Sequence, residues 1–249
     1  MSSARHTATH SEAADLRLGR WQTALADVRE VGALIADPPY SERTHSAETT
    51  RNDGVDAAGL TPDYPPWTPD DVHEFVQAWS ERVSGWMVCL TDHALIGAYE
   101  DAYEAAGRYV FAPVPCCIGG MSHRMQADGP SSEVVYAVVA RPRSREFVDL
   151  KWNMRGYYEG PSIRNGRRGG SVSGKGRGKP PWLKHALVRD YSRPGDLVCD
   201  PLAGFGGTLA AALAYGRRAV GSEMDLAAYR EALRRLRRPL QIDMFGGAA

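Results

Sequence analysis

The stretch VCDPLAGFGGTLAAALAYGRRAVGSEMD, residues 198–225, predicts the fold of this chain. It reads as a buried strand, a tight glycine turn, an alanine-rich helix and a second strand with an acid at its end. In such a unit the glycines let the backbone approach a ligand at the carboxyl end of a parallel sheet. Glu223 follows Gly204 at about the spacing at which these folds place the acid that binds a ribose hydroxyl.

Two other interpretations of the glycine turn stay open. A dinucleotide-binding turn has a third glycine at the position that Leu209 occupies here. A plain strand–turn–helix connection has similar glycines and binds no ligand.

Strands alternate with helices along the rest of the chain, which predicts an α/β fold with a mainly parallel sheet. Seven strands are expected, at residues 16–18, 31–37, 85–92, 108–114, 132–142, 196–200 and 218–225. Residues 1–14 are expected to form a disordered tail, and residues 15–249 one domain.

Composition is that of an ordinary globular protein. Of 249 residues, 43% are hydrophobic and 24% charged, and Lys+Arg and Asp+Glu are both 30, so net charge indicates no partner. The polar start MSSARHTATHSEAAD is unlike a signal peptide, and no apolar run is long enough to span a bilayer. We therefore expect a cytoplasmic protein without a membrane partner.

Cysteine spacing argues against disulfides and metal. The four cysteines show no CxxC pair, which favours a reduced chain. A site built from Cys116, Cys117 and His123 is the best metal candidate, but it lacks paired-ligand spacing. We expect no metal.

Two motifs carry a family resemblance. DPLAGFGGT (200–208) resembles the D-P-F-A-G-S-G-T signature of S-adenosylmethionine-dependent amino-methyltransferases, and DPPY (37–40) is similar to their catalytic D/N/S-P-P-Y/F/W. The catalytic motif comes first and the cofactor motif last, as in the circularly permuted β group of bacterial and phage DNA methyltransferases. The runs at 178–201 and 221–236 resemble the same group.

The resemblance implies a Rossmann-like methyltransferase fold with S-adenosylmethionine as cofactor. The cofactor residues that it implies are Asp200, Pro201, Ala203, Gly204, Gly206, Thr208 and Glu223, with Lys179 as partner of the cofactor carboxylate. The chain departs from the family at Arg20, where an aspartate usually lies near the adenine, and at Leu202, Phe205 and Gly207 of the turn.

The implied catalytic residues are Asp37, Pro38, Pro39 and Tyr40. An exocyclic amine of a base is a poor nucleophile, because its lone pair is delocalised into the ring. Asp37 and the carbonyl of Pro38 can each accept an N–H, the prolines fix the backbone, and Tyr40 can stack on a flipped-out base. The plain alternative is a proline turn that ends a strand, with Tyr40 packed in the core.

A basic, glycine-rich stretch at about 151–180 occupies the place of the family's target-recognition region. It is expected to follow a phosphate backbone, or else to be a disordered basic linker. The neighbouring Trp152, Tyr157 and Tyr158 are candidates to stack or wedge, and loop 41–66 is expected to lie over the flipped base. The predicted DNA contacts are Arg164, Arg167, Arg168, Lys175 and Arg177, and the same acid-free stretch includes Lys179 and Lys184.

The favoured function is methylation of adenine N6 in DNA, because adenine enzymes of this family more often carry an acid or amide at the position of Asp37 and cytosine-N4 enzymes a serine. Cytosine-N4 methylation, RNA methylation, and a nucleic-acid-binding protein that has lost catalysis remain alternatives. A glutamine-modifying protein methyltransferase also uses a P-P-Y motif, but with the opposite motif order. A homodimer and a partner restriction nuclease are left open by the sequence.

Overall fold

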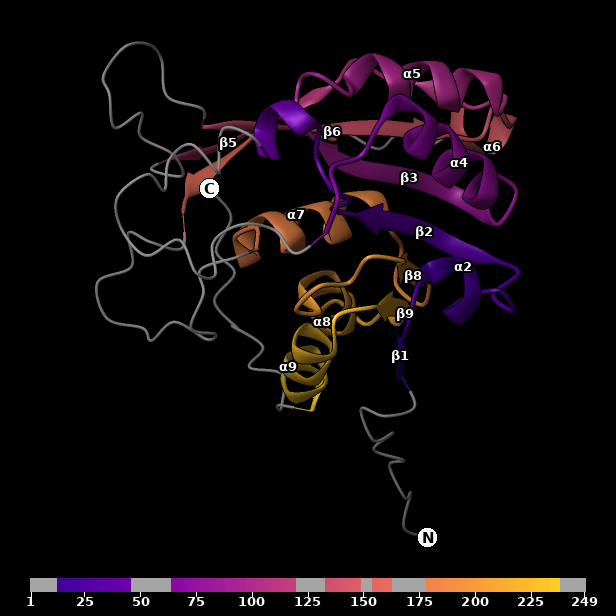
Figure 1. Cartoon of the computed structure of the whole chain (residues 1–249). Coiled ribbons are helices and arrows are strands. Elements are labelled where there is room, and N and C mark those ends of the chain that lie inside the picture. The colour runs from indigo at the N-terminus through magenta and orange to yellow at the C-terminus, as the bar shows by residue number, and fades with distance from the viewer. Residues whose placement is uncertain (1–12, 46–63, 120–132, 149–153, 163–177, 238–249) are drawn as a thin grey trace, which may run out of the picture.

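The computed structural model describes residues 13–45, 64–119, 133–148, 154–162 and 178–237. Nine strands form one sheet in the order β1-β9-β8-β2-β3-β6-β5-β7, with β4 also paired to β6 (Figure 1). Pairing is parallel except where β6 meets β3, β4 and β5, so the sheet is mainly parallel, as expected. The strands are β1 (Ala14–Leu18), β2 (Val31–Ala36), β3 (Val83–Thr91), β4 (Tyr109–Val110), β5 (Val114–Gly119), β6 (Val134–Arg141), β7 (Tyr158–Pro161), β8 (Leu197–Asp200) and β9 (Arg218–Glu223).

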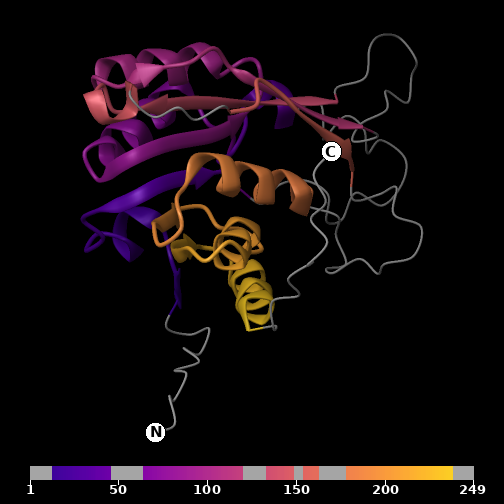
Figure 2. The ribbon, with the colours of Figure 1, turned by 180° about the vertical axis from the view of Figure 1, so that it is seen from behind.

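Helices cover both faces of the sheet. One face packs against α2 (Trp21–Ala24), α4 (Pro69–Ser80) and α5 (Ile96–Ala105), and the other against α7 (Pro181–Tyr191), α8 (Gly207–Ala214) and α9 (Leu226–Leu236). Seen from behind, the orange α7 and yellow α9 lie on the opposite side of the sheet from the magenta α5 (Figure 2). The short α6 (Arg145–Val148) follows β6.

Strand β2 shows why a continuous apolar run marks a central strand. Its side chains alternate between the two faces, and Ile35 joins one core cluster while Leu34 and Ala36 join the other. All three are fully buried. A strand covered on both faces has no position at which a polar side chain would reach water.

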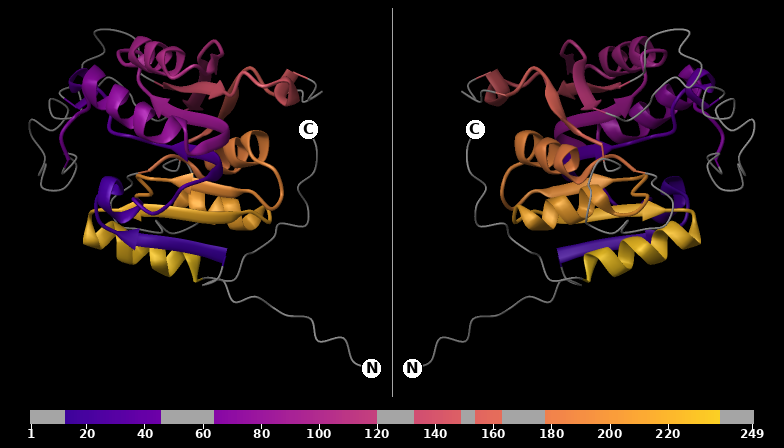
Figure 3. Two further views of the ribbon diagram at one scale, coloured as in Figure 1. Left: turned by 90° about the vertical axis from the view of Figure 1, so that its right-hand side faces the viewer. Right: turned by 90° about the vertical axis from the view of Figure 1, so that its left-hand side faces the viewer.

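Strands β2 and β8 are neighbours, although they lie far apart in the sequence. They pair in parallel through Ala33 with Val198 and Leu34 with Cys199. Their carboxyl ends therefore meet at one edge of the sheet, where Asp37 follows β2 and Asp200 ends β8. Further along, β1 runs beside β9 (Figure 3), so the chain's first strand flanks its last.

The expected count of seven strands is wrong, for two physical reasons. The single strand predicted at 108–114 is interrupted before Pro113, which has no N–H to donate, and the chain instead forms β4 and then β5. Strand β7 lies inside the basic, glycine-rich stretch, in which no strand was predicted, and it pairs in parallel with β5. The alternation of strands and helices along the sequence could not reveal β7, because this four-residue strand depends on its pairing with another strand.

The ends of the predicted tail and loop are partly described. Strand β1 begins at Ala14, the last residue of the predicted tail, and residues 1–12 lie outside the described part. Residues 46–63 of loop 41–66 are outside it as well. Where the chain is described, no helix has the length and apolar character needed to cross a bilayer.

Candidate active site

The carboxylate of Asp37 lies at the centre of a cluster of donors. The hydroxyl of Tyr40 donates to its Oδ1 at 3.1 Å. The ammonium nitrogen of Lys179 is 3.4 Å from Oδ1, and that of Lys184 is 3.6 Å from Oδ2. The structure thus brings three of the sequence-predicted site residues together and adds a fourth, Lys184, to them.

These donors decide the charge of the site. Burial raises the pKa of Asp37, but the two lysines and the Tyr40 hydroxyl outweigh burial and hold the pKa below its ordinary value. Asp37 is therefore an ionised hydrogen-bond acceptor at neutral pH. Burial and the neighbouring Asp37 carboxylate raise the pKa of Tyr40 well above its usual range, so Tyr40 remains a phenol that donates.

Lys179 also covers the ring of Tyr40. Its Nζ lies 4.4 Å from the ring centroid, within the range of a cation–π contact. Lys179 thus contacts the catalytic motif in this structure. Its predicted contact with a cofactor carboxylate stays a prediction.

Asp92 fixes the segment that follows Tyr40. Its carboxylate, just beyond β3, accepts hydrogen bonds from the backbone N–H of Ser41 at 3.1 Å and from the hydroxyls of Ser41 and Thr44. It also accepts from the backbone N–H groups of Ala94 at 3.1 Å and Leu95 at 3.3 Å. Burial raises the pKa of Asp92, but the hydrogen bonds from Ser41 and Thr44 outweigh it and lower the pKa.

The glycine turn after β8 is built for close approach. Gly204 and Gly206 have φ of +52° and +72°, in the left-handed region that favours glycine. A Cβ on Gly206 would lie 3.0 Å from the Cβ of Ala232, so α8 and α9 pack closely there. A Cβ on Gly204 would meet nothing within 4 Å, which leaves open space beside the backbone.

Glu223 is held against this turn. Its Oε2 accepts the backbone N–H of Gly204 at 2.8 Å, and its Oε1 accepts that of Asp225 at 2.7 Å. Burial raises its pKa, and these two N–H groups oppose the rise. The carboxylate is thereby fixed in orientation and can still accept from a ligand through its remaining lone pairs.

The other cofactor candidates line the same turn. Asp200 is buried and accepts the backbone N–H of Leu202 at 3.2 Å, while the carbonyl of Pro201 accepts the Ser222 hydroxyl at 2.7 Å. Ala203 donates its N–H to the carbonyl of Ser222 at 2.9 Å, which ties the turn to β9.

Thr208 is a further cofactor candidate beside Asp200 at this turn. Its hydroxyl is buried at the start of α8 and makes no hydrogen bond of good geometry with the described residues. It lies near enough to Asp200 to oppose the rise in the pKa of that carboxyl, but this contact leaves its hydrogen-bonding capacity unfilled. A buried polar group of this kind needs a partner. The open space beside Gly204 and the carboxylate of Glu223 oriented there leave room for a polar ligand such as the expected cofactor.

Arg20, at which the sequence differs from the family pattern, lies near Glu223. It is exposed at the N-terminal end of α2, directly after Gly19, whose N–H donates to the carbonyl of Glu223 at 2.9 Å. Within the described ranges Arg20 forms no ion pair and no side-chain hydrogen bond.

The basic stretch is described only at its two ends. All five arginine and lysine residues predicted to contact DNA fall within 163–177, outside the described residues. At one end Ser162 donates its N–H to the carbonyl of Gly119 at 2.9 Å, and at the other Lys179 reaches Asp37. Both ends of the segment are therefore fixed to the described fold, and the second lies beside Asp37 in the candidate active site.

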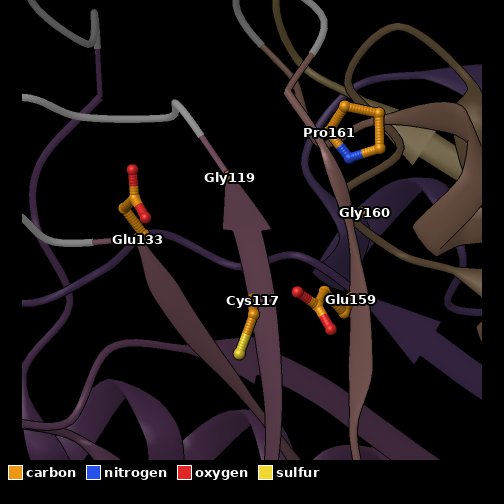
Figure 4. Close-up of a pocket in the computed structure, with 6 residues that line it drawn as sticks. All are labelled: Cys117, Gly119, Glu133, Glu159, Gly160 and Pro161. Carbon is orange, nitrogen blue, oxygen red and sulfur yellow. The ribbon is translucent and has the colours of Figure 1, made fainter.

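The first end borders a cavity of about 440 Å³ over β5, flanked by β7 and the start of β6 (Figure 4). Two segments outside the described residues, 120–132 and 163–177, begin beside this cavity. The residues that line it are Cys117, Gly119, Glu133, Glu159, Gly160 and Pro161.

One predicted stacking residue is excluded from that role. Tyr158 is buried and donates its hydroxyl to Asp190 of α7 at 2.8 Å, because β7 packs under that helix. Tyr157 is 60% exposed, and Trp152 lies outside the described residues. No three metal-ligating side chains gather anywhere in the described ranges, which do not include His123.

Sequence reasoning did not identify Lys184 or Asp92 as site residues. Lys184 stood in a basic stretch and was grouped with residues facing DNA, but it is buried. A signal was present, since Lys184 follows Leu183 and precedes Val188 by one helical turn, on the apolar side of α7. Asp92 lies outside both motifs, and only the packing of β3 beside β2 reveals it.

Comparisons with known proteins agree with this geometry. Residues 137–234 match a family model described as DNA methylase. Among solved structures, M1.HpyAVI in complex with SAM aligns with a TM-score of 0.63 at 18% identity, covering 89% of this chain and 99% of that one. The protein TTHA0409 from Thermus thermophilus, complexed with S-adenosyl-L-methionine, aligns with a TM-score of 0.58 at 21% identity, covering 89% and 92%.

The cytosine-N4-specific PvuII DNA methyltransferase aligns with a TM-score of 0.62 at 13% identity, covering 90% of this chain and 86% of that one. A search of curated protein sequences finds no match. The chain thus resembles the DNA methylase family over residues 137–234, and its fold is that of the DNA methyltransferases.

Proposed function

We propose that this protein is an S-adenosylmethionine-dependent DNA methyltransferase, of the permuted bacterial or phage type, that methylates the exocyclic N6 of adenine. The observation that carries the proposal is the position of Asp37 and the glycine turn at the ends of the adjacent strands β2 and β8. Ligands bind at such carboxyl ends in open α/β sheets. A target base and a cofactor held there would be neighbours.

Each side of the site has its own task. Gly204, Thr208 and Glu223 would hold the cofactor, which supplies an activated methyl group when bound. Asp37, ionised by its two lysines, would accept an N–H of the target amine, and the Pro38 carbonyl would accept another. Two acceptors favour a pyramidal nitrogen with its lone pair free for the methyl group, so the protein acts through positioning and electrostatics.

Tyr40 would stack on the base. Its ring is partly buried, its carbonyl is fixed by the N–H of Trp67 at 3.0 Å, and its hydroxyl is fixed by Asp37. A base inside a duplex cannot reach this position, so the target must be flipped out. Lys179 lies over one face of this ring, and it would have to move aside for a base to stack on that face.

The basic segment would hold the DNA. Its arginines and lysines are Arg164, Arg167, Arg168, Lys175 and Arg177, and the chain re-enters the described fold at Gly178 and Lys179, beside Asp37. Phosphates bound by this segment would bring the duplex to the catalytic aspartate.

Cytosine-N4 methylation is the second candidate, because the similar PvuII enzyme is cytosine-N4-specific. The aspartate at position 37 favours adenine. Incubation with labelled S-adenosylmethionine and mixed-sequence duplex DNA, followed by mass spectrometry of the nucleosides, tests both. N6-methyladenine is expected; N4-methylcytosine would select the alternative.

A second experiment tests the alternative that the protein binds nucleic acid but has lost catalysis. Calorimetry with S-adenosylmethionine is expected to show binding by the wild-type protein. A protein that binds DNA but neither binds the cofactor nor labels any base would overturn the proposal and favour a nucleic-acid-binding protein that kept the fold.

A further inference from the structure

Lys184 is a buried lysine whose surroundings demand a partner. It is 7% exposed on α7, beside the fully buried Leu183, Leu187 and Val188. Burial of a charged amine is strongly unfavourable unless an opposite charge compensates it. Removing one partner of such a pair leaves the other as an uncompensated buried charge, so the lysine and its carboxylate depend on each other.

The compensating charges are two carboxylates from neighbouring strands. Nζ of Lys184 lies 3.6 Å from Oδ2 of Asp37. Burial raises the pKa of Asp200, Lys184 opposes that rise, and the negative charge of Asp37 adds to it. Lys184 thus interacts electrostatically with both the acid of the predicted catalytic motif and the first acid of the cofactor motif, which repel each other.

The two lysines at Asp37 differ in how firmly they are held. Lys179 lies in the connection before α7, next to residues outside the described part, and its Nζ lies over the ring of Tyr40, on which a base would stack. It shares Oδ1 with the Tyr40 hydroxyl. Lys184 is fixed by helix packing and lies at Oδ2. Entry of a base would displace Lys179 and leave Lys184 in place.

We propose that Lys184 is a positioning residue that keeps Asp37 ionised and oriented through Oδ2 while Oδ1 is given over to the target amine. The inference rests on the proposed function, since it assigns Asp37 the amine. Lys179 would then be the displaceable partner and Lys184 the permanent one.

The inference predicts how the rate depends on pH. Without Lys184, one of the charges that hold down the pKa of Asp37 is lost, so Asp37 takes up a proton at higher pH, and a protonated Asp37 no longer accepts as a carboxylate. Activity should fall on the acid side and return on the alkaline side. The ionisable groups that interact with Asp37 are Lys179, Lys184, Tyr40, Cys89, Tyr99, Cys116 and Asp200. Among these groups the variants change only Lys184, so a difference between variants reports the effect of Lys184.

The experiment compares single-turnover methyl transfer from about pH 4, near the ordinary pKa of an aspartate, to about pH 9 in the wild type and four variants. Lys184→Met and Lys184→Gln remove the charge, and Lys184→Arg keeps it. Arg189→Met is the matched control, since it removes a positive charge from the same helix at a side chain that is 46% exposed and pairs with Asp190.

We expect Lys184→Met and Lys184→Gln to move the acid limb upward by about one pH unit or more. Most of the wild-type rate should return at alkaline pH. Lys184→Arg and Arg189→Met should leave the limb in place. A rate lowered by one common factor at every pH would overturn the proposal, because a merely structural lysine would produce that result.

A readout without catalysis separates this inference from the proposed function. Carbon-13 spectra of aspartate-labelled protein, with Asp37→Asn identifying the signal, follow the Asp37 carboxyl in the absence of DNA and cofactor. The signal should titrate at higher pH in Lys184→Gln than in wild type. An unchanged titration would contradict the role of Lys184 even if methylation is found. A shifted titration without methylation would support the Lys184–Asp37 charge pair and contradict the proposed function.

Discussion

Asp37 is the residue on which the proposed chemistry depends most. We predict that Asp37→Ala leaves cofactor affinity nearly unchanged, because the cofactor candidates belong to the glycine turn and Glu223. Methyl transfer should fall more than tenfold, which corresponds to about 1.4 kcal/mol of barrier. Calorimetry and turnover at saturating DNA measure the two effects.

The control is Asp101→Ala, which removes an exposed carboxylate from α5. It should change neither property. An Asp37→Ala protein that kept more than a tenth of the wild-type turnover would show that the acid is not the acceptor of the amine proton.

Asp92 affects the site through the fold. Asp92→Asn should destabilise the protein by about 2 kcal/mol, because an amide replaces a charged acceptor of hydrogen bonds from Ser41 and Thr44. The folded protein lowers the pKa of Asp92, so its contribution is present above the unfolded pKa and is lost as pH falls through the folded pKa. Urea unfolding at neutral and acid pH measures both.

Two comparisons make that result specific. The difference in unfolding free energy between wild type and Asp92→Asn should shrink in acid, where Asp92 is itself protonated. Asp101→Asn, the same substitution at an exposed site, should have little effect at either pH. A difference that does not depend on pH would mean that packing, rather than the charge, holds the segment after Tyr40.

At the scale of elements, prediction succeeded where local chemistry is sufficient. The β8–α8–β9 unit follows from its glycines and alanine-rich helix, and the buried strand β2 from its apolar run. It failed where an element depends on its neighbours. Strand β7 exists because it pairs with β5 and packs under Trp182, whose ring lies so close to Gly160 that a Cβ there would be 2.5 Å from it. A sequence pattern contains no such contact.

Strands β3 and β2 also approach each other too closely for a side chain at one position. A Cβ on Gly85 would lie 2.2 Å from the carbonyl oxygen of Gly32, which is backbone and cannot move aside alone. We predict that Gly85→Ala lowers the free energy of unfolding by about 1–3 kcal/mol, as overpacking does. Denaturant unfolding followed by circular dichroism provides the measurement.

The matched control lies in a helix. A Cβ on Gly97 of α5 would meet nothing within 4 Å, and alanine is the better helix former, so Gly97→Ala should be neutral or stabilise by up to about 1 kcal/mol. Equal effects of the two substitutions would mean that β2 and β3 can separate slightly at little cost.

At the scale of the molecule, the order of the two motifs predicted which strand ends lie side by side. It did not predict which charged side chains pair inside the site. The parallel pairing of β2 with β8 confirms that Asp37 and the glycine turn share one edge. Lysine positions could not be predicted in the same way. Lys179 and Lys184 look alike in the sequence, and only the docking of α7 onto the sheet places one at Oδ1 and the other at Oδ2 of Asp37.

The last prediction concerns how the whole molecule holds DNA. Each arginine or lysine that neutralises a phosphate releases a counterion, so the slope of log affinity against log salt is about −0.9 per contact on duplex DNA. Replacing Arg164, Arg167 and Arg168 together by glutamine should flatten that slope by roughly two to three units. Duplex binding measured from low to moderate salt, wild type against triple variant, provides the comparison.

Cofactor affinity should be unchanged in the triple variant, because these arginines belong to none of the cofactor motifs. A second triple variant, Arg230, Arg234 and Arg237 to glutamine on and just beyond α9, removes equal charge elsewhere in the described fold and should leave the slope nearly as it is. Equal slopes for the wild type and the first variant would mean that the segment's charges stay solvated in the complex. The duplex would then have to reach Asp37 from another side, and loop 41–66, which begins directly after Tyr40 in the sequence, would become the next segment to test.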